Sequence, residues 1–346
     1  MPQDREVLEV DGYPGYSKEE IAERHRRVRT LLHREGLDGL LVYGAGRFQL
    51  DLHWFTNWPG GREGLLLLPT EGEPVLLVEL FNHLPLAQRL SRIADTRWGG
   101  PHLMATAAEL LRPRPRRRWG VVGALPWEGA ARLQEAVPDL ALVPFAAYHA
   151  LRLIRSSEEM AFVRRAAAIT DAAVLALWQQ LQPGMSEAEA ASCFAQACLA
   201  AGGYASLHFL AATAMDAPTA FLPHQYQSSR RISVGDIVVT ELNGAFWGYS
   251  SQVHRCFVLG DALKPPYDRL HAVAVETYEA IESALKPGAS VREVVREAKR
   301  IAQAGYTIVD DLLHGLNQSA PIVRTAEADH GTTPWDFVFA EGMVIT

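Results

Sequence analysis

The sequence contains few cysteines: only Cys193, Cys198 and Cys256 among 346 residues. Three thiols cannot build a disulfide framework, and no Cys-x-x-Cys pair is present that could form a zinc knuckle. Cys193 and Cys198 fall in an alanine-rich helical stretch, where free cysteines usually pack in a core. We therefore expect a protein of the reducing cytoplasm that has no stabilising disulfides.

The chain also lacks a long apolar run and a surplus of positive charge. No stretch reaches the roughly 18 apolar residues that span a bilayer, and the start, Met1-Pro-Gln-Asp-Arg-Glu6, has no apolar signal region. The net charge is −7 at pH 7, whereas nucleic-acid binding needs clustered Lys and Arg. These absences predict a partner that is neither a membrane nor a nucleic acid.

What is present is the pattern of two globular domains. Hydrophobic residues make up 48% of the chain, enough for a sizeable core. Ser17-Lys-Glu-Glu20 is a capping box that opens a helix running to about His33. Short apolar strands follow, among them Leu40–Tyr43, Leu65–Leu68 and Trp119–Val122. Alternating helices and strands predict an α/β domain over residues 1–152.

A faint internal repeat marks the second domain, residues 153–346. The segment Leu181-Gln-Pro-Gly-Met-Ser-Glu-Ala-Glu189 recurs as Leu285-Lys-Pro-Gly-Ala-Ser-Val-Arg-Glu293. Each copy ends a helix at a Pro-Gly turn and opens another with a Ser-x-x-Glu cap. The repeat predicts two similar halves that pair helices with an antiparallel sheet. Two ordinary helix–turn–helix connections would give the same pattern.

Polar residues gather after the strand-like run Asp236–Thr240. Glu241 follows it directly, and Gln252 and His254 alternate along a second strand, so their side chains face one side. A hairpin through residues 244–248 would bring Glu241 opposite that side. His224 lies on a polar loop, where an imidazole can act as a general base or simply be a surface residue. His314 is either a satisfied core residue or a cap.

Several of these segments resemble the creatinase, prolidase and methionine aminopeptidase superfamily, peptidase family M24. The resemblance rests on the following segments: residues 235–255, His314-Gly315, Glu341-Gly-Met-Val344, Arg24-His-Arg-Arg-Val-Arg29 and Gly36-Leu-Asp-Gly-Leu-Leu-Val42. It implies an α/β creatinase-like N-terminal domain and an α+β "pita-bread" catalytic domain of two similar halves.

The family's peptidases hold two divalent ions with two Asp, one His and two Glu. The resemblance puts Glu241 and Gln252 at the Asp positions and His314 at the His position. One Glu position falls in Gln318-Ser-Ala-Pro321, which has no acid, and the other would follow Thr346; the sequence leaves open whether the natural chain continues there. Two close dications need several carboxylates. We therefore expect no metal site and no cofactor.

Creatinase, the metal-independent branch of the family, gives a better match. Its catalytic histidine corresponds to His224, eleven residues before Gly235, and its second active-site histidine to His314. Its substrate-gripping arginine falls at Thr325, with Arg324 beside it. The creatinase first domain places an arginine in the neighbouring subunit's site, and Arg62 resembles that residue. The resemblance thus implies a homodimer in which the N-terminal domain contributes to the partner's site.

The prediction from sequence is a metal-independent, creatinase-like hydrolase that acts on a C–N bond of a small polar, carboxylate-bearing substrate, and a non-peptidase rather than a peptidase. The expected catalytic groups are His224, His254, His314 and Glu241. Substrate would be bound by Arg62, Arg324, Tyr249, Trp247 and Gln252. Three alternatives remain: a non-hydrolytic lyase, a mononuclear metal-dependent aminopeptidase or prolidase-like hydrolase, and a non-catalytic pseudo-peptidase.

Overall fold

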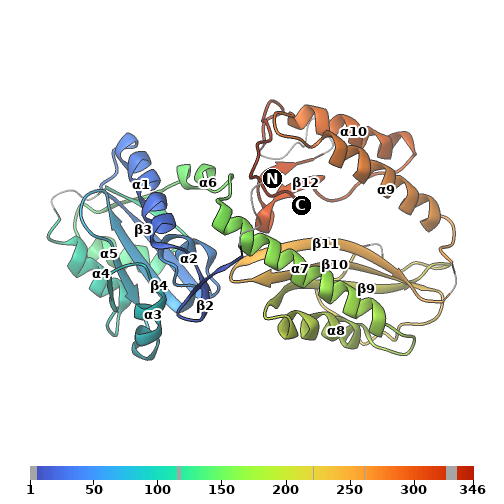
Figure 1. Ribbon diagram of the computed structural model, residues 1–346, viewed down its shortest axis with the longest axis horizontal. Helices are drawn as coiled ribbons and strands as arrows, with labels where there is room; N and C mark the ends of the chain where they lie inside the picture. Colours follow the sequence, from blue (N-terminus) through green and yellow to red (C-terminus); the bar gives the residue numbers. More distant parts are fainter. Residues whose placement is uncertain (1–5, 115–117, 221, 261, 325–332) are drawn as a thin grey trace. The chain divides into compact units, whose positions relative to one another are not determined.

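The computed structural model describes residues 6–114, 118–220, 222–260, 262–324 and 333–346. The chain divides into two compact units, Met1–Arg152 and Leu153–Thr346. Figure 1 shows both units, coloured along the sequence. Within the described ranges, no helix combines the length and the apolar character needed to cross a bilayer.

A six-stranded sheet forms the centre of the first unit, in the order β6-β5-β4-β3-β7-β8. The unit's strands are β1 (Leu8–Val10), β2 (Tyr13–Gly15), β3 (Gly39–Arg47), β4 (Gly60–Pro69), β5 (Val75–Val78), β6 (Asp95–Trp98), β7 (Arg118–Val122) and β8 (Ala141–Pro144). The middle strands read as unbroken apolar runs, Leu40–Val42 and Leu65–Leu68, because both faces of the sheet are covered.

Helices cover this sheet. They are α1 (Lys18–Arg34), α2 (Leu50–Thr56), the 3₁₀ turn η1 (Phe81–His83), α3 (Leu84–Leu90), α4 (Leu103–Leu111), α5 (Trp127–Ala136) and α6 (Ala147–Leu151). The Ser17 side chain accepts a hydrogen bond from the Glu20 N–H at the start of α1. The predicted α/β class of this domain is confirmed.

The second unit begins with two helices that pack on a three-stranded antiparallel sheet, in the order β11-β10-β9. Its first half contains α7 (Ser157–Gln180), α8 (Glu187–Ala200), β9 (Tyr204–Ala214), β10 (Asp236–Phe246) and β11 (Tyr249–Val258). In Figure 1, α7 and α8 run along this sheet. The capping box at Ser156 and Glu159 starts α7.

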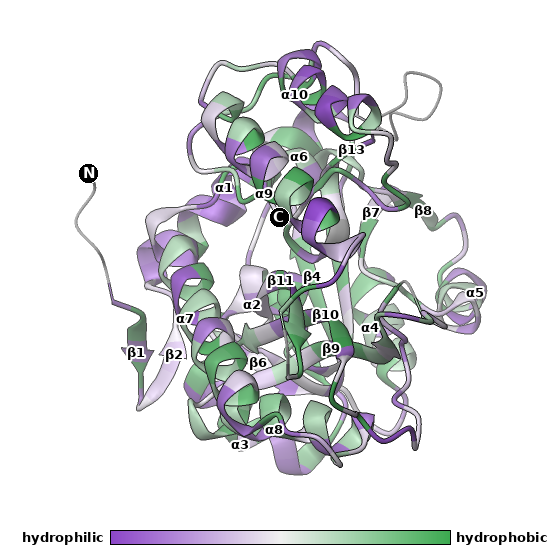
Figure 2. Cartoon of the chain, turned by 90° about the vertical axis from the view of Figure 1, so that its right-hand side faces the viewer, coloured by the Kyte–Doolittle hydropathy of each residue, from purple (hydrophilic) through white to green (hydrophobic). Residues whose placement is uncertain are grey.

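The second half repeats the arrangement on a smaller scale. It contains α9 (Tyr267–Ala284), α10 (Val291–Gln303), β12 (Leu313–Gly315), the 3₁₀ turn η2 (Leu316–Gln318) and β13 (Ser319–Val323). α10 is amphipathic: its valines pack in the core, and its hydrophilic turns are purple in Figure 2.

The two halves share a local backbone motif as well as the order of their helices and strands. Ser186 and Ser290 each cap a helix in a complete capping box. Each also forms an isolated antiparallel bridge to a later segment, Ser186 with Arg231 and Ser290 with Val338. The predicted pita-bread fold of two similar halves is therefore confirmed, and the repeated Pro-Gly-x-Ser sequence is the junction that both halves use.

Candidate functional site

The polar residues after Thr240 lie on one β-hairpin. β10 and β11 are joined by a tight turn at Trp247 and Gly248, which both have positive φ (50° and 89°). Two left-handed residues match the twist of the flanking strands. The register pairs Glu241 with His254, and Asn243 with Gln252. The turn thus fixes which side chains become cross-strand neighbours.

One face of this hairpin packs on α7. The Gly244 N–H donates to Thr170 Oγ1 at 3.0 Å, and Phe246 and Tyr249 pack against Phe162. Because side chains alternate along a strand, the residues between these positions face the opposite way. We call that opposite side the site face. It carries Glu241, Asn243, Ser250, Gln252 and His254.

Tyr249 therefore does not line the site face, which corrects the expectation that its ring walls the substrate pocket. The side chain is fully buried, and its hydroxyl donates to Glu159 Oε1 of α7 at 2.8 Å. The alternation of the strand turns it away from Gln252. Trp247 occupies the hairpin turn and is half-buried.

The polar contacts of the site face centre on Glu241. The Gln252 amide Nε2 donates to Glu241 Oε1 and lies 3.5 Å from His254 Nε2. Glu241 is 8% exposed and Asn243 is 9% exposed, whereas His254 is open to solvent. Within the described part of the chain, Asn243 Oδ1 is buried and accepts no hydrogen bond. The face thus holds a buried carboxylate beside an unused acceptor.

Asn317, three residues after His314, contacts the hairpin. Asn317 hydrogen-bonds Ser250 Oγ on the site face, and its Nδ2 donates to the Gly248 carbonyl at 3.3 Å. The His314 backbone pairs with Thr346, and its Nδ1 lies 2.9 Å from the Gly315 carbonyl oxygen. The β12–η2 segment is thereby fixed at the turn end of the hairpin.

Each of the remaining predicted residues contacts a segment other than this hairpin. His224 is exposed, and its carbonyl oxygen accepts from the Leu210 N–H of β9 at 3.2 Å. Arg324 Nε donates to Asp311 at 2.8 Å, and Thr325 lies outside the described residues. Arg62 belongs to the first unit, where its Nε lies 3.5 Å from Glu79. The structure brings Glu241, Gln252 and His254 together, and it adds Asn243 and Asn317, which sequence reasoning missed.

The site face does not fit a pair of metal ions. Among the residues that the structure describes, no three His, Cys, Asp or Glu side chains group closely enough to hold a metal. Gln252 turns its NH₂ group toward Glu241, and an amide nitrogen that donates cannot ligate a cation. Two dications need several anionic oxygens, whereas this face supplies the single carboxylate of Glu241.

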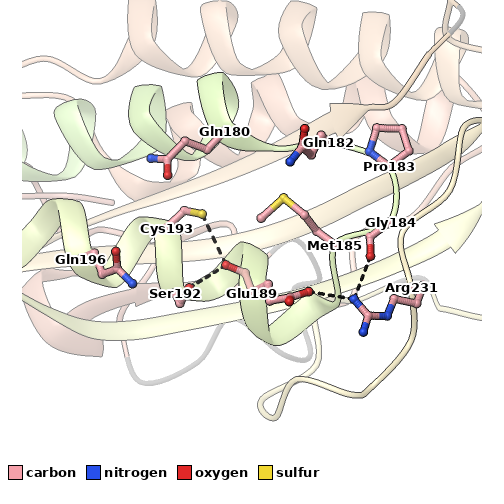
Figure 3. Close-up of a pocket in the computed structure, with 10 residues that line it drawn as sticks. All are labelled: Gln180, Gln182, Pro183, Gly184, Met185, Glu189, Ser192, Cys193, Gln196 and Arg231. Atoms are coloured by element: carbon pink, nitrogen blue, oxygen red, sulfur yellow. Dashed lines mark hydrogen bonds and ion pairs between the residues drawn. The ribbon is translucent and has the colours of Figure 1, made fainter.

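A separate hollow of about 490 Å³ lies beside α8 and the Pro183-Gly184 turn (Figure 3). Arg231 crosses it and bonds Glu189 at 3.0 Å and the Gly184 carbonyl at 2.9 Å. The charges of Arg231 and Glu189 thus already pair with each other. None of the predicted site residues lines the hollow. The site face is therefore the better candidate for chemistry.

Comparison with known families covers both units. Residues 161–346 match the model of metallopeptidase family M24. The chain belongs to metallopeptidase family M24. Residues 24–155 match the creatinase/prolidase N-terminal domain, so this M24 chain has the two-domain organisation expected from its sequence motifs.

Individual relatives carry peptidase names. The chain is 28% identical over 201 residues to the Xaa-Pro dipeptidase of Pyrococcus furiosus, covering 57% of this chain and 55% of that protein. It is 30% identical over 200 residues to the Xaa-Pro dipeptidase of Pyrococcus horikoshii, covering 57% and 54%. The match thus spans about half the length of these relatives. The crystal structure of the P. horikoshii prolidase superposes with a TM-score of 0.77 at 22% identity, covering 93% of this chain and 89% of that one, which shows the shared fold.

These relatives overturn the predicted function. The prediction of a metal-independent, creatinase-like enzyme is wrong, because the chain matches a metallopeptidase family. The preference for a non-peptidase is also wrong, because the relatives are named as dipeptidases. The match to creatinase relied on the spacing of His224, and spacing alone did not distinguish the branches. The alternative of a prolidase-like hydrolase agrees better with these comparisons.

Proposed function

We propose that this M24 chain is a peptidase that acts on small peptides, with Xaa-Pro dipeptides as the first substrates to test. The names of its relatives support the reaction class. The observation that carries the proposal is the buried Glu241 carboxylate on the site face of the M24 hairpin, flanked by amide and imidazole groups. Such a face can hold a short polar ligand by several directed hydrogen bonds.

We propose Glu241, Gln252, His254 and His314 as the substrate-contacting residues. Glu241 and Gln252 would orient the ligand, and the imidazoles of His254 and His314 would donate or accept a proton in the reaction. The same proposal includes a homodimer in which Arg62 contributes to the partner's site. It also includes a cytoplasmic location.

The test is proline release from a panel of Xaa-Pro dipeptides by the full chain, with and without added Mn²⁺, Co²⁺ or Zn²⁺. We expect release that falls at least about tenfold in kcat/KM in Glu241→Gln, because a charge-assisted contact is lost. Glu189→Gln, an exposed glutamate of α8, is the matched control and should keep wild-type activity. A folded chain that releases no proline under any of these conditions contradicts the proposal.

A second candidate is a protein that binds small peptides without cleaving them. It is favoured by one contact, the Gln252 amide that donates to the Glu241 carboxylate where the family resemblance expects two acids. Titration calorimetry with the same dipeptides separates the two candidates, because saturable binding without proline release supports binding alone.

A further inference from the structure

We infer that Glu187 is a positioning residue for substrate binding, which acts from α8 through the segment 224–230. We call this segment the strap. The inference rests on the proposed function, since it takes the site face as the place where small peptides bind. It adds a residue that touches no ligand and lies on a different element from every residue proposed to contact the substrate.

Glu187 holds the strap by three hydrogen bonds. Its Oε2 accepts from the Ser228 N–H at 2.8 Å and from the Ser228 hydroxyl at 2.7 Å, and its own N–H donates to the Arg230 carbonyl at 3.2 Å. Its Oε1 accepts from the Ala212 N–H of β9 at 2.8 Å. Glu187 is 1% exposed, and α8 packs on β9, beside which it lies in Figure 1. One buried side chain thus joins the strap to both elements.

Two other contacts keep the strap along the outer edge of β9. The His224 carbonyl accepts from the Leu210 N–H at 3.2 Å. The Gln227 amide donates to the His208 carbonyl at 2.8 Å. These bonds place the first half of the strap, and Glu187 holds the second half. The backbone between residues 224 and 228 is therefore fixed at both ends.

The strap presents two rings close to the site face. His224 is exposed and Tyr226 is 88% exposed, and neither ring contacts a described residue through a hydrogen bond or ring pair. Leu210, which bonds His224, pairs with Thr240 on β10, directly before Glu241. Two strand spacings, about 10 Å, therefore separate the strap from β10. An extended dipeptide is about 7 Å long without its side chains, so a ligand that contacts Glu241 reaches the strap.

An exposed ring on a fixed backbone can bind the far residue of such a ligand. A covered tyrosine ring buries about 150–250 Å² of surface. Binding also costs less when the backbone that carries the contact is already ordered. A loose strap would have to be ordered at each binding event. Glu187 therefore contributes to the affinity for the substrate without touching it.

The test compares proline release from Leu-Pro by the wild-type chain, Glu187→Gln and Ser228→Ala, under the conditions that give the highest wild-type rate. Glu187→Gln turns an NH₂ group toward one of the donors, and Ser228→Ala removes the hydroxyl donor at an exposed position. We expect KM to rise at least about fivefold and about threefold respectively, with kcat within about twofold of wild type. Ser229→Ala is the matched control, since Ser229 is exposed and has no hydrogen bond with a described residue; its KM should be unchanged.

A double-mutant cycle separates positioning from a general loss of stability. In a chain that carries His224→Ala and Tyr226→Ala, Glu187→Gln should have no further effect on KM, because the strap then has no ring to position. The same fold increase in both backgrounds overturns the inference, as does a wild-type KM in the chain without the two rings.

Amide hydrogen exchange provides a readout that needs no substrate. The Leu210 N–H bonds the His224 carbonyl of the strap. Its exchange should be at least about tenfold faster in Glu187→Gln than in the wild type, because the strap then opens more often. An unchanged exchange rate means that Glu187 does not hold the strap, and overturns the inference.

Calorimetry with Leu-Pro distinguishes failure of this inference from failure of the proposed function, and its Kd replaces KM for any variant without turnover. Leu-Pro that binds without cleavage, with a Kd that rises at least about fivefold in Glu187→Gln, supports the inference and contradicts a peptidase. Cleavage with the same KM in the wild type and in Glu187→Gln does the reverse. A folded wild-type chain that neither binds nor cleaves Leu-Pro contradicts both.

Discussion

Glu187 should be among the most important single residues for the stability of the second unit. It is the first residue of α8 and is buried, yet it forms no ion pair with a described residue. Its carboxylate accepts from the Ala212 N–H of β9 at 2.8 Å, and from the Ser228 N–H at 2.8 Å and hydroxyl at 2.7 Å. One side chain thus connects a helix, a strand and the loop that carries His224.

Glu187→Ala would leave the buried Ala212 N–H and the two donors of the exposed Ser228 without their acceptor. An orphaned buried group costs about 1–3 kcal/mol, whereas Ser228 can bond water instead, so we expect a loss of about 2–4 kcal/mol. Glu187→Gln keeps the volume but turns an NH₂ group toward another donor, for a loss of about 1–3 kcal/mol. Either value is a large fraction of the roughly 5–15 kcal/mol of a typical domain.

Urea unfolding followed by two probes measures the change, provided that the m-value stays constant. Glu189→Gln is the matched control, two residues away on the same helix. Glu189 is exposed and serves the capping box of Ser186, so its loss should matter less. If Glu187→Gln and Glu189→Gln unfold at the same urea concentration, the three hydrogen bonds do not stabilise the unit as argued.

Three further predictions concern both units. Burial acts to raise the pKa of Asp236, but the paired Arg230 guanidinium helps to lower it below 3.8; stability should therefore fall as the pH drops through that lowered pKa, and Asp236→Asn should flatten this part of an acid-unfolding profile. A methyl group on Gly244 would meet Thr170 Oγ1 at 2.6 Å. Gly244→Ala should therefore lower the free energy of unfolding, measured with urea, by about 1–3 kcal/mol. Burial lowers the pKa of His25 from 6.5 to about 4. Only the unfolded chain binds a proton between these values, so on the order of 3 kcal/mol should be lost between pH 6.5 and 4, and a His25→Gln variant that shows the same loss would refute this.

The sequence was most informative where local chemistry decides structure. The serine caps predicted at 17, 186 and 290 all start helices, because a side-chain oxygen three residues from an N–H acts without help from the rest of the fold. The apolar strands of the first unit were likewise predictable. In the second unit, β10 begins at Asp236 as expected but continues beyond Thr240 to Phe246. The hairpin extends farther because its turn needs only Trp247 and Gly248.

The candidate site was less predictable, since it depends on register and on contacts between distant segments. Period-two alternation from Glu241 would have pointed to Asn243, but an asparagine in a strand-like run carries no signal of being buried and unpaired. Asn317 reaches Ser250 across 67 positions of sequence, and no local pattern predicts such a contact. His224 was chosen for its spacing, yet its position is set by the backbone of β9.

The loop that carries His224 also protects the sheet from unwanted association. Three outward-facing backbone groups of β9 are occupied: the His208 carbonyl accepts from Gln227, the Leu210 N–H donates to His224, and the Ala212 N–H donates to Glu187. An exposed strand edge with free groups invites a foreign strand and the growth of fibrils. Because Glu187 and the loop occupy these three groups, a chain that lost Glu187 should become more prone to aggregate as well as to unfold.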